Sequence, residues 1–191
     1  MRITVTGVKR LERQLDPKLL QLALKRGLER TTTTAVKEAS QAVRAIYNIK
    51  ARDVKDNLRV KKPTVRDLVV TIYMSSKPIP LFAFGGRRIK VRKKPRNSSR
   101  TRTYYGASAK ILRKGKRVKY KGAFIASKGA KTGIFKRKGA ARLPIVEKRV
   151  ISPTTMFRKY GVDRIEEVFN RVFEERVMAD YRYRISKAGG A

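Results

Sequence analysis

Acidic side chains one helical turn apart are the first candidates for chemistry in this sequence. Asp53 and Asp56 have the spacing with which a metal-dependent nuclease brings two carboxylates to one ion. Arg52, Lys55 and Arg59 surround them, and cations this close would pair with the carboxylates. We interpret the two aspartates as solvated helix charges.

Other catalytic chemistries lack the residues they need. The chain has no His and no Cys, which excludes imidazole bases, thiolate nucleophiles and most zinc sites. The pairs Glu166–Glu167 and Glu174–Glu175 balance the basic residues of the C-terminal segment, and the Gly- and Lys-rich stretch 133–142 does not match a phosphate-cradling loop. The sequence therefore predicts no enzyme activity, no cofactor, no bound metal and no small-molecule substrate.

Basic residues, by contrast, gather in two clusters. In the first, positions 88, 90, 92 and 94 of an extended segment would lie on one side, about 6.6 Å apart. Such a row suits sequence-blind contact with a phosphate backbone. The alternative is that the same row, on an edge strand, serves merely to prevent aggregation. The second cluster surrounds Gly115 at the tip of an expected hairpin. The candidate nucleic-acid or partner-binding residues are Arg87, Arg88, Lys90, Arg92, Lys93, Lys94, Arg96, Arg113, Lys114, Lys116 and Arg117.

Two tyrosines follow the first cluster. Tyr104 and Tyr105 could stack on unpaired bases, or lie half-buried in a strand as tyrosines more often do.

The distribution of charge is the strongest functional signal. The chain carries 50 Lys and Arg against 14 Asp and Glu, and residues 68–146 hold 23 of the basic residues with no acidic one. Like charges so concentrated repel one another in the folded state, so a polyanion or an acidic protein surface is expected to supply the missing counter-charge. A merely solvated basic surface is the remaining alternative.

The N-terminal part predicts a short strand over 2–6 and a long helix. Asp16 is placed as the N-cap and Pro17 as the first helical residue. Small and apolar residues then recur every three or four positions, so this face should pack on a sheet, a neighbouring subunit or both. A bend is possible at 31–34, where four threonines have poor helix propensity. The predicted stripe is Leu20, Leu24, Gly27, Leu28, Thr31, Ala35, Ala39, Ala42 and Ile46.

The middle of the chain predicts a short helix over 50–58, strands over 60–63 and 68–74, and a loop or strand end around 78–86. The β-branched second strand is expected to be central. Residues 87–102 are interpreted as a mobile basic arm or loop, and 105–112 with 118–126 as a β-hairpin.

A turn region over 151–161 and a closing helix from Arg164 to about Ile185 complete the prediction. The helix should bury Ile165, Val168, Phe169, Val172, Val177 and Ala179, and expose the pairs Glu167–Arg171 and Asp180–Arg184. The expected fold is α+β: a long N-terminal helix and a C-terminal helix packed on a mostly antiparallel sheet. Residues 1–185 form one domain with a basic insertion at about 85–142, and 186–191 form a frayed tail. With no membrane-length apolar run or signal-peptide core, we expect a soluble protein made in a cytoplasm.

An ordered series of packing and turn motifs carries a family resemblance. NIKARDVKDNLRVKKPT (48–64) is followed by LVVTIYMSSKPIPLFAFGGRR (68–88), KGAFIA (121–126), TGIFKRKG (132–139) and RLPIVEKR (142–149). In order and spacing this series resembles the minor tail protein Z family of long-tailed phages, also called tail-completion proteins, from about residue 1 to 185.

The resemblance implies a non-enzymatic virion protein at the head-proximal end of the tail, assembled in the host cytoplasm. It implies a ring of about six copies around the tail channel, other tail and neck proteins as partners, and a possible contact with the genomic DNA end. The charge over 87–121 exceeds what the family needs. A free-standing, sequence-nonspecific nucleic-acid-binding protein is the alternative, based on charge alone.

Overall fold

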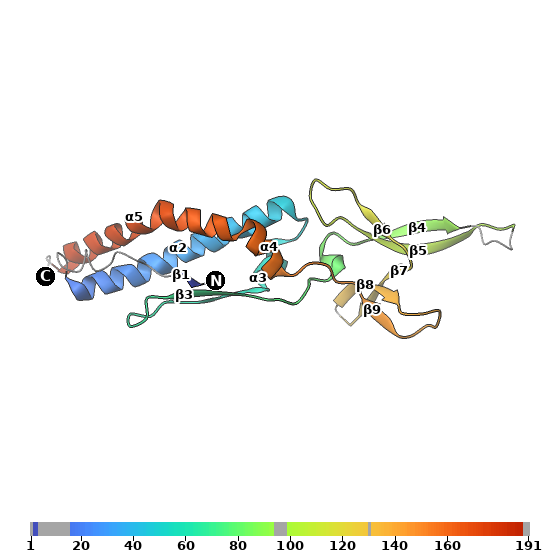
Figure 1. The fold of residues 1–191 in the computed structure, drawn as a ribbon, viewed down its shortest axis with the longest axis horizontal. Helices are drawn as coiled ribbons and strands as arrows, with labels where there is room; N and C mark the ends of the chain where they lie inside the picture. Colours follow the sequence, from blue (N-terminus) through green and yellow to red (C-terminus); the bar gives the residue numbers. More distant parts are fainter. Residues whose placement is uncertain (1, 4–15, 94–98, 130, 189–191) are drawn as a thin grey trace. The chain divides into compact units, whose positions relative to one another are not determined.

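The chain forms two units, which we call the helical unit and the basic unit. The computed structural model describes residues 2–3, 16–93, 99–129 and 131–188 (Figure 1). The helical unit comprises residues 1–43, 55–75 and 156–191, and the basic unit comprises residues 44–54 and 76–155. Each is described by itself.

The helical unit combines two long helices with a small antiparallel sheet. The sheet has the order β1-β3-β2, with β1 at Arg2–Ile3, β2 at Leu58–Lys61 and β3 at Val70–Met74. The central position of β3 confirms the prediction for its β-branched sequence. The helices are α2 (Pro17–Ile46), whose last residues belong to the basic unit, and α5 (Val162–Ala188).

The start of α2 is where the sequence placed it. Both Lys18 and Leu19 donate their backbone N–H groups to Asp16 Oδ1, at 2.8 and 3.3 Å. Asp16 therefore caps the helix and Pro17 occupies its first position. The helix continues through the four threonines, where Thr32, Thr33 and Thr34 each donate a hydroxyl hydrogen bond to the carbonyl four residues earlier.

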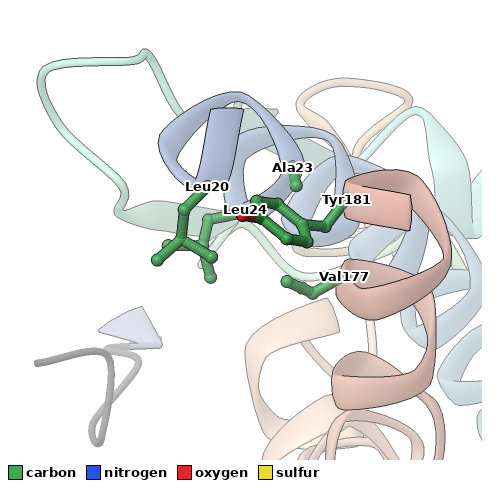
Figure 2. Packing of buried hydrophobic residues seen from close by; sticks show 5 residues of the cluster. All are labelled: Leu20, Ala23, Leu24, Val177 and Tyr181. Atoms are coloured by element: carbon green, nitrogen blue, oxygen red, sulfur yellow. The ribbon is translucent and has the colours of Figure 1, made fainter. Parts of the chain in front are cut away.

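The buried face of α2 packs on α5 of the same chain. Leu20, Ala23 and Leu24 contact Val177 and Tyr181 in one apolar cluster (Figure 2). Leu68, two residues before β3, packs against this cluster. A Cβ at Gly27 would lie 2.5 Å from Val177 Cγ2, so glycine permits the close approach of the two helices. The apolar face of α2 was predicted to pack on a sheet or a neighbouring subunit, and in the structure it packs mainly on α5.

Two ends of the predicted stripes are wrong. In α2, Val43 is buried, whereas Ala42 is half-buried and Ile46 is 37% exposed. In α5, Ala179 is exposed and Asp180 is buried, because a charged residue was assigned to the solvent side by its type alone.

Ion pairs connect α2 to α5 at both ends of their contact. Asp180 accepts from Arg184 Nε at 2.6 Å within α5 and lies 3.4 Å from Arg26 Nε of α2. Glu38 of α2 pairs with Arg164 at 2.9 Å and with Arg171 at 2.7 Å. The early part of α2 thus meets the late part of α5, so the helices run antiparallel.

These contacts also replace one predicted pair. Asp180–Arg184 is confirmed, but Glu167 pairs with Arg164, and Arg171 reaches across to Glu38. The prediction considered only i,i+4 spacing within one helix, which gives no information on partners from another helix.

The basic unit contains two three-stranded antiparallel sheets. The first has the order β4-β5-β6, with β4 at Arg87–Lys93, β5 at Arg102–Ala109 and β6 at Val118–Tyr120. The second has the order β7-β8-β9, with β7 at Ala123–Lys128, β8 at Lys131–Arg137 and β9 at Ile145–Glu147. Their shared core consists of Leu81, Ala107, Ala109, Ala123 and Ile134.

Several predicted elements of this unit change. The basic arm is wrong for residues 87–93, which form a regular strand paired with β5. The returning hairpin strand ends at Tyr120, and its second half becomes β7 of the other sheet. The stretch 131–137, left without an element, is β8.

Three short helices also differ from the prediction. The first, α3, covers only Ala51–Lys55. A 3-10 helix, η1 (Leu81–Ala83), follows Pro80. The expected turn region contains α4 (Pro153–Tyr160), which has Pro153 in its first turn and a hydrogen bond from the Thr155 N–H to Ser152 Oγ at 3.3 Å.

The α+β class is confirmed. The last helix runs to Ala188, three residues beyond its predicted end, and 189–191 lie outside the described residues, as do 4–6 of the first predicted strand. A single folding domain over 1–185 stays a prediction.

The contact between Gly27 and Val177 generates a test of the helix packing. Replacing Gly27 by Ala in a helix interior would ordinarily stabilise by up to about 1 kcal/mol. Here we expect a lower free energy of unfolding, by about 1–3 kcal/mol, because the new methyl group overlaps the Val177 side chain. Urea denaturation measures it.

The matched control is the double variant Gly27→Ala with Val177→Ala. Removing the two methyl groups of Val177 makes space, so the two substitutions should be less destabilising together than their separate effects sum to. Additive losses would contradict this packing.

Candidate polyanion-binding surface

The basic unit has almost no internal counter-charge. Its residues include 28 Lys and Arg but only two acids, Asp53 and Glu147. Glu147 already forms an ion pair with Arg149, with 2.7 Å between Glu147 Oε2 and Arg149 Nη2. The helical unit, with 22 basic and 12 acidic residues, carries a far smaller excess. Any external anion is therefore attracted mainly to the basic unit.

A two-stranded ribbon presents the first predicted cluster. β4 pairs with β5 from Arg87↔Ser108 to Lys93↔Arg102. β6 pairs only with residues 107–109 of β5, so the outer part of the ribbon consists of β4 and β5 alone (Figure 1). Its inner end is held by the buried residues Ala107 and Ala109.

One face of the ribbon is cationic. Because side chains alternate along a strand, Arg88, Lys90 and Arg92 share a face, and all three are exposed. Tyr105, the cross-strand partner of Lys90, lies on that face too, and the Arg88 guanidinium sits 5.4 Å from the centre of its ring. The predicted row of cations is therefore present at 88, 90 and 92.

The opposite face is apolar in its middle, between the strand positions of Arg87 and Lys93. Ile89 is half-buried, Val91 is 39% exposed, and Tyr104, paired with Val91, is 47% exposed. Tyr104 and Tyr105 thus point to opposite sides of the ribbon. They do not form a joint platform on which two neighbouring bases could stack.

The hairpin tip divides into two kinds of cation. Arg117 donates from Nη1 to the carbonyl of Gly85 at 2.8 Å, and Arg113 donates from Nε to the carbonyl of Arg44 at 2.7 Å. Gly85 has φ +67°, a conformation that glycine adopts readily, and Arg117 holds this turn. Lys114 and Lys116 are exposed. Two of the four predicted residues thus have a structural use.

Three predicted binding residues have no described side chain. Lys94 and Arg96 lie outside the described residues, and Lys93 is described only as a strand position. Arg87 is exposed at the inner end of β4.

The second sheet adds cations that the sequence analysis did not single out. Charge density was the only sequence signal for them, because 131–142 had no predicted element to place them on one surface. The exposed members on and after β8 are Lys131, Lys136, Arg137, Lys138 and Arg142.

Other kinds of site are not seen in the described part of the chain. No cluster of three His, Cys, Asp or Glu residues there could hold a metal ion. None of the helices that the structure describes is both long and apolar enough to cross a membrane.

Burial raises the pKa of the Tyr120 phenol, which packs against the core shared by the two sheets.

Comparison with known families identifies the chain. The family model of prophage minor tail protein Z matches residues 3–187, nearly the whole sequence. The chain belongs to the prophage minor tail protein Z family. No curated protein and no solved structure gives a match.

The family membership confirms the resemblance found in the motifs. It makes the chain a structural protein of a phage tail and hence a component of the virion, whose partners include other tail proteins. The basic unit is then the most highly charged part of a protein that works within an assembly.

The two kinds of tip cation generate a second test. Arg117→Ser should lower the free energy of unfolding by about 1–3 kcal/mol, because the carbonyls of Gly85 and Ser108 lose a charged donor. Lys116→Ser, one position away and exposed, should change it by less than about 0.5 kcal/mol. Thermal unfolding of both variants checks this, and equal stability of the two would refute the structural use of Arg117.

Proposed function

We propose that this minor tail protein Z family member completes the tail at its head-proximal end. It assembles as a ring of about six copies around the tail channel. Its basic unit contacts the end of the genomic DNA and neighbouring neck proteins through the ribbon and the hairpin tip. The observation that carries the proposal is the excess of 28 basic over two acidic residues in that unit.

The arrangement of the cations supports a phosphate ligand. The exposed side chains of Arg88, Lys90 and Arg92 follow one another along one face of β4. Their spacing of about 6.6 Å is comparable to that of successive phosphates along one DNA strand, so sequence-blind backbone contacts can form. Because Tyr104 and Tyr105 face opposite ways, the ribbon favours duplex backbone over stacked single-stranded bases.

The amount of charge limits how much of it DNA can neutralise. Duplex DNA carries one charge per about 1.7 Å, so a ring about 40 Å tall would surround about 24 phosphate charges. Six copies of the segment 68–146 bring almost 140 cations. Most of them must face solvent or acidic partners, and only a subset lines the channel.

A free-standing nucleic-acid-binding protein is the second candidate, since charge alone would serve it. It does not require self-association, whereas the tail ring does. The oligomeric state therefore separates the two.

The ring is tested on the purified protein by analytical ultracentrifugation, and its incorporation by co-sedimentation with isolated tails. We expect particles of about six times the 21.8 kDa chain mass, in free solution or upon addition of isolated tails. A monomer under both conditions, never recovered with tails, would favour the second candidate.

The DNA contact is tested by the salt dependence of binding to a 30-base-pair duplex. Each phosphate contact contributes about 0.9 to the slope of log K against log salt concentration. The triple variant Arg88→Ser, Lys90→Ser, Arg92→Ser should therefore reduce the slope by about 2 to 3. Lys61→Ser, Lys62→Ser, Arg66→Ser removes equal charge from exposed sites of the helical unit and should leave the slope nearly unchanged. Equal slopes for the ribbon variant and the parent protein would remove the DNA role of the ribbon.

A further inference from the structure

The outer edge of β4 is open in the described part of the chain. β4 is the first strand of its sheet, and only β5 pairs with it there. The pairing is regular over all seven residues from Arg87 to Lys93. A strand this long and this regular presents a row of unpaired backbone donors and acceptors, which is a template for another strand.

The charges beside this edge reject a second copy of the same edge. Two β4 strands side by side would bring the cations Arg88, Lys90 and Arg92 of one copy next to those of the other. No residue from 68 to 146 supplies an acid to relieve that repulsion. The same cations attract an acidic strand. They therefore disfavour pairing with a second β4 edge and favour pairing with an acidic segment.

The two faces of β4 define the sequence of a matching strand. Arg88, Lys90 and Arg92 flank the edge on one face, and Ile89 and Val91 flank it on the other, beside Tyr104. An added strand places its alternate side chains on the same two faces. Acidic residues at every second position would then lie beside the cations, and aliphatic residues between them would cover the apolar face.

We propose that the outer edge of β4 binds an extended segment of a partner protein in which acidic residues alternate with aliphatic ones. In the proposed ring most cations would have no phosphate partner, and such a segment would neutralise those of the ribbon. The proposal does not need the DNA contact, because strand addition uses the backbone edge and duplex binding does not.

The competing site for the same segment is the open edge of β5. Over residues 102–106 β5 has only β4 as a partner. That edge is shorter, and Arg102 at its outer end is the one basic residue among 102–106, against the row at 88, 90 and 92 beside the edge of β4. β4 is therefore the better match for an acidic strand.

The test uses a fluorescent peptide, Glu-Val-Glu-Val-Glu-Val-Glu, and the full-length protein at about physiological salt. Anisotropy should show saturable binding. A peptide of the same composition in blocks, with four Glu followed by three Val, should bind at least tenfold more weakly, because it cannot place acids on one face. The alternating peptide with its central amides N-methylated should also lose at least tenfold, since it cannot pair with a strand edge.

Variants locate the site. Arg88→Ser, Lys90→Ser, Arg92→Ser should weaken the alternating peptide at least tenfold. Lys131→Ser, Lys136→Ser, Lys138→Ser removes three exposed cations from the second sheet of the same unit and should weaken it less than threefold. Circular dichroism of both variants confirms that they remain folded.

Three results would overturn the proposal: equal binding of the alternating and block peptides, retained binding after N-methylation, or equal losses in the two triple variants. Each would mean that the unit attracts anions only by its overall charge. These results leave the salt dependence of duplex binding untouched, so the DNA contact stands or falls separately.

Discussion

Uncompensated positive charge in the basic unit is the constraint on which the rest of this structure depends. With 28 cations and two acids, the unit cannot pair its charges internally, so it must keep them apart and in water. Two small antiparallel sheets do this well, because a thin core of Ala107, Ala109, Ala123, Leu81 and Ile134 leaves most strand positions at the surface. The unit thus accommodates its charge on strands that are largely exposed.

The helical unit has a much smaller excess of charge, and ion pairs and apolar packing within the chain stabilise it. Its buried Asp180 pairs with Arg26 across the helix contact and with Arg184 within α5, and the half-buried Glu38 pairs with Arg164 and Arg171. Its helices approach closely through Gly27, and the apolar cluster around Tyr181 completes the packing. A unit of this kind is held together by its own contacts, whereas the basic unit has only two acids against its 28 basic residues.

The sequence analysis succeeded where a local rule decides the structure. Asp16 and Pro17 predicted the start of α2, because capping depends only on neighbouring residues. The family, too, followed from an ordered series of local motifs. Local rules failed where a tertiary contact decides: Asp180 is buried because Arg26 reaches it from another helix, and no spacing within α5 indicates that. The strand β8 was missed because its ends are Lys- and Gly-rich, and its pairing with both neighbours outweighs that composition.

The candidate surface shows the same division between composition and geometry. Charge density pointed to residues 68–146, most of which form the basic unit, but it treated every cation alike. The structure separates Arg113 and Arg117, which hold backbone carbonyls, from Lys114 and Lys116, which are exposed. It also shows that residues 87–93 of the expected arm form a strand, with Arg88, Lys90 and Arg92 on one face and Ile89 and Val91 in the middle of the other. A mobile arm could offer its charge to any anion in any orientation. A strand holds it at fixed spacing beside a fixed edge, and the proposed choice of an alternating acidic partner depends on that geometry.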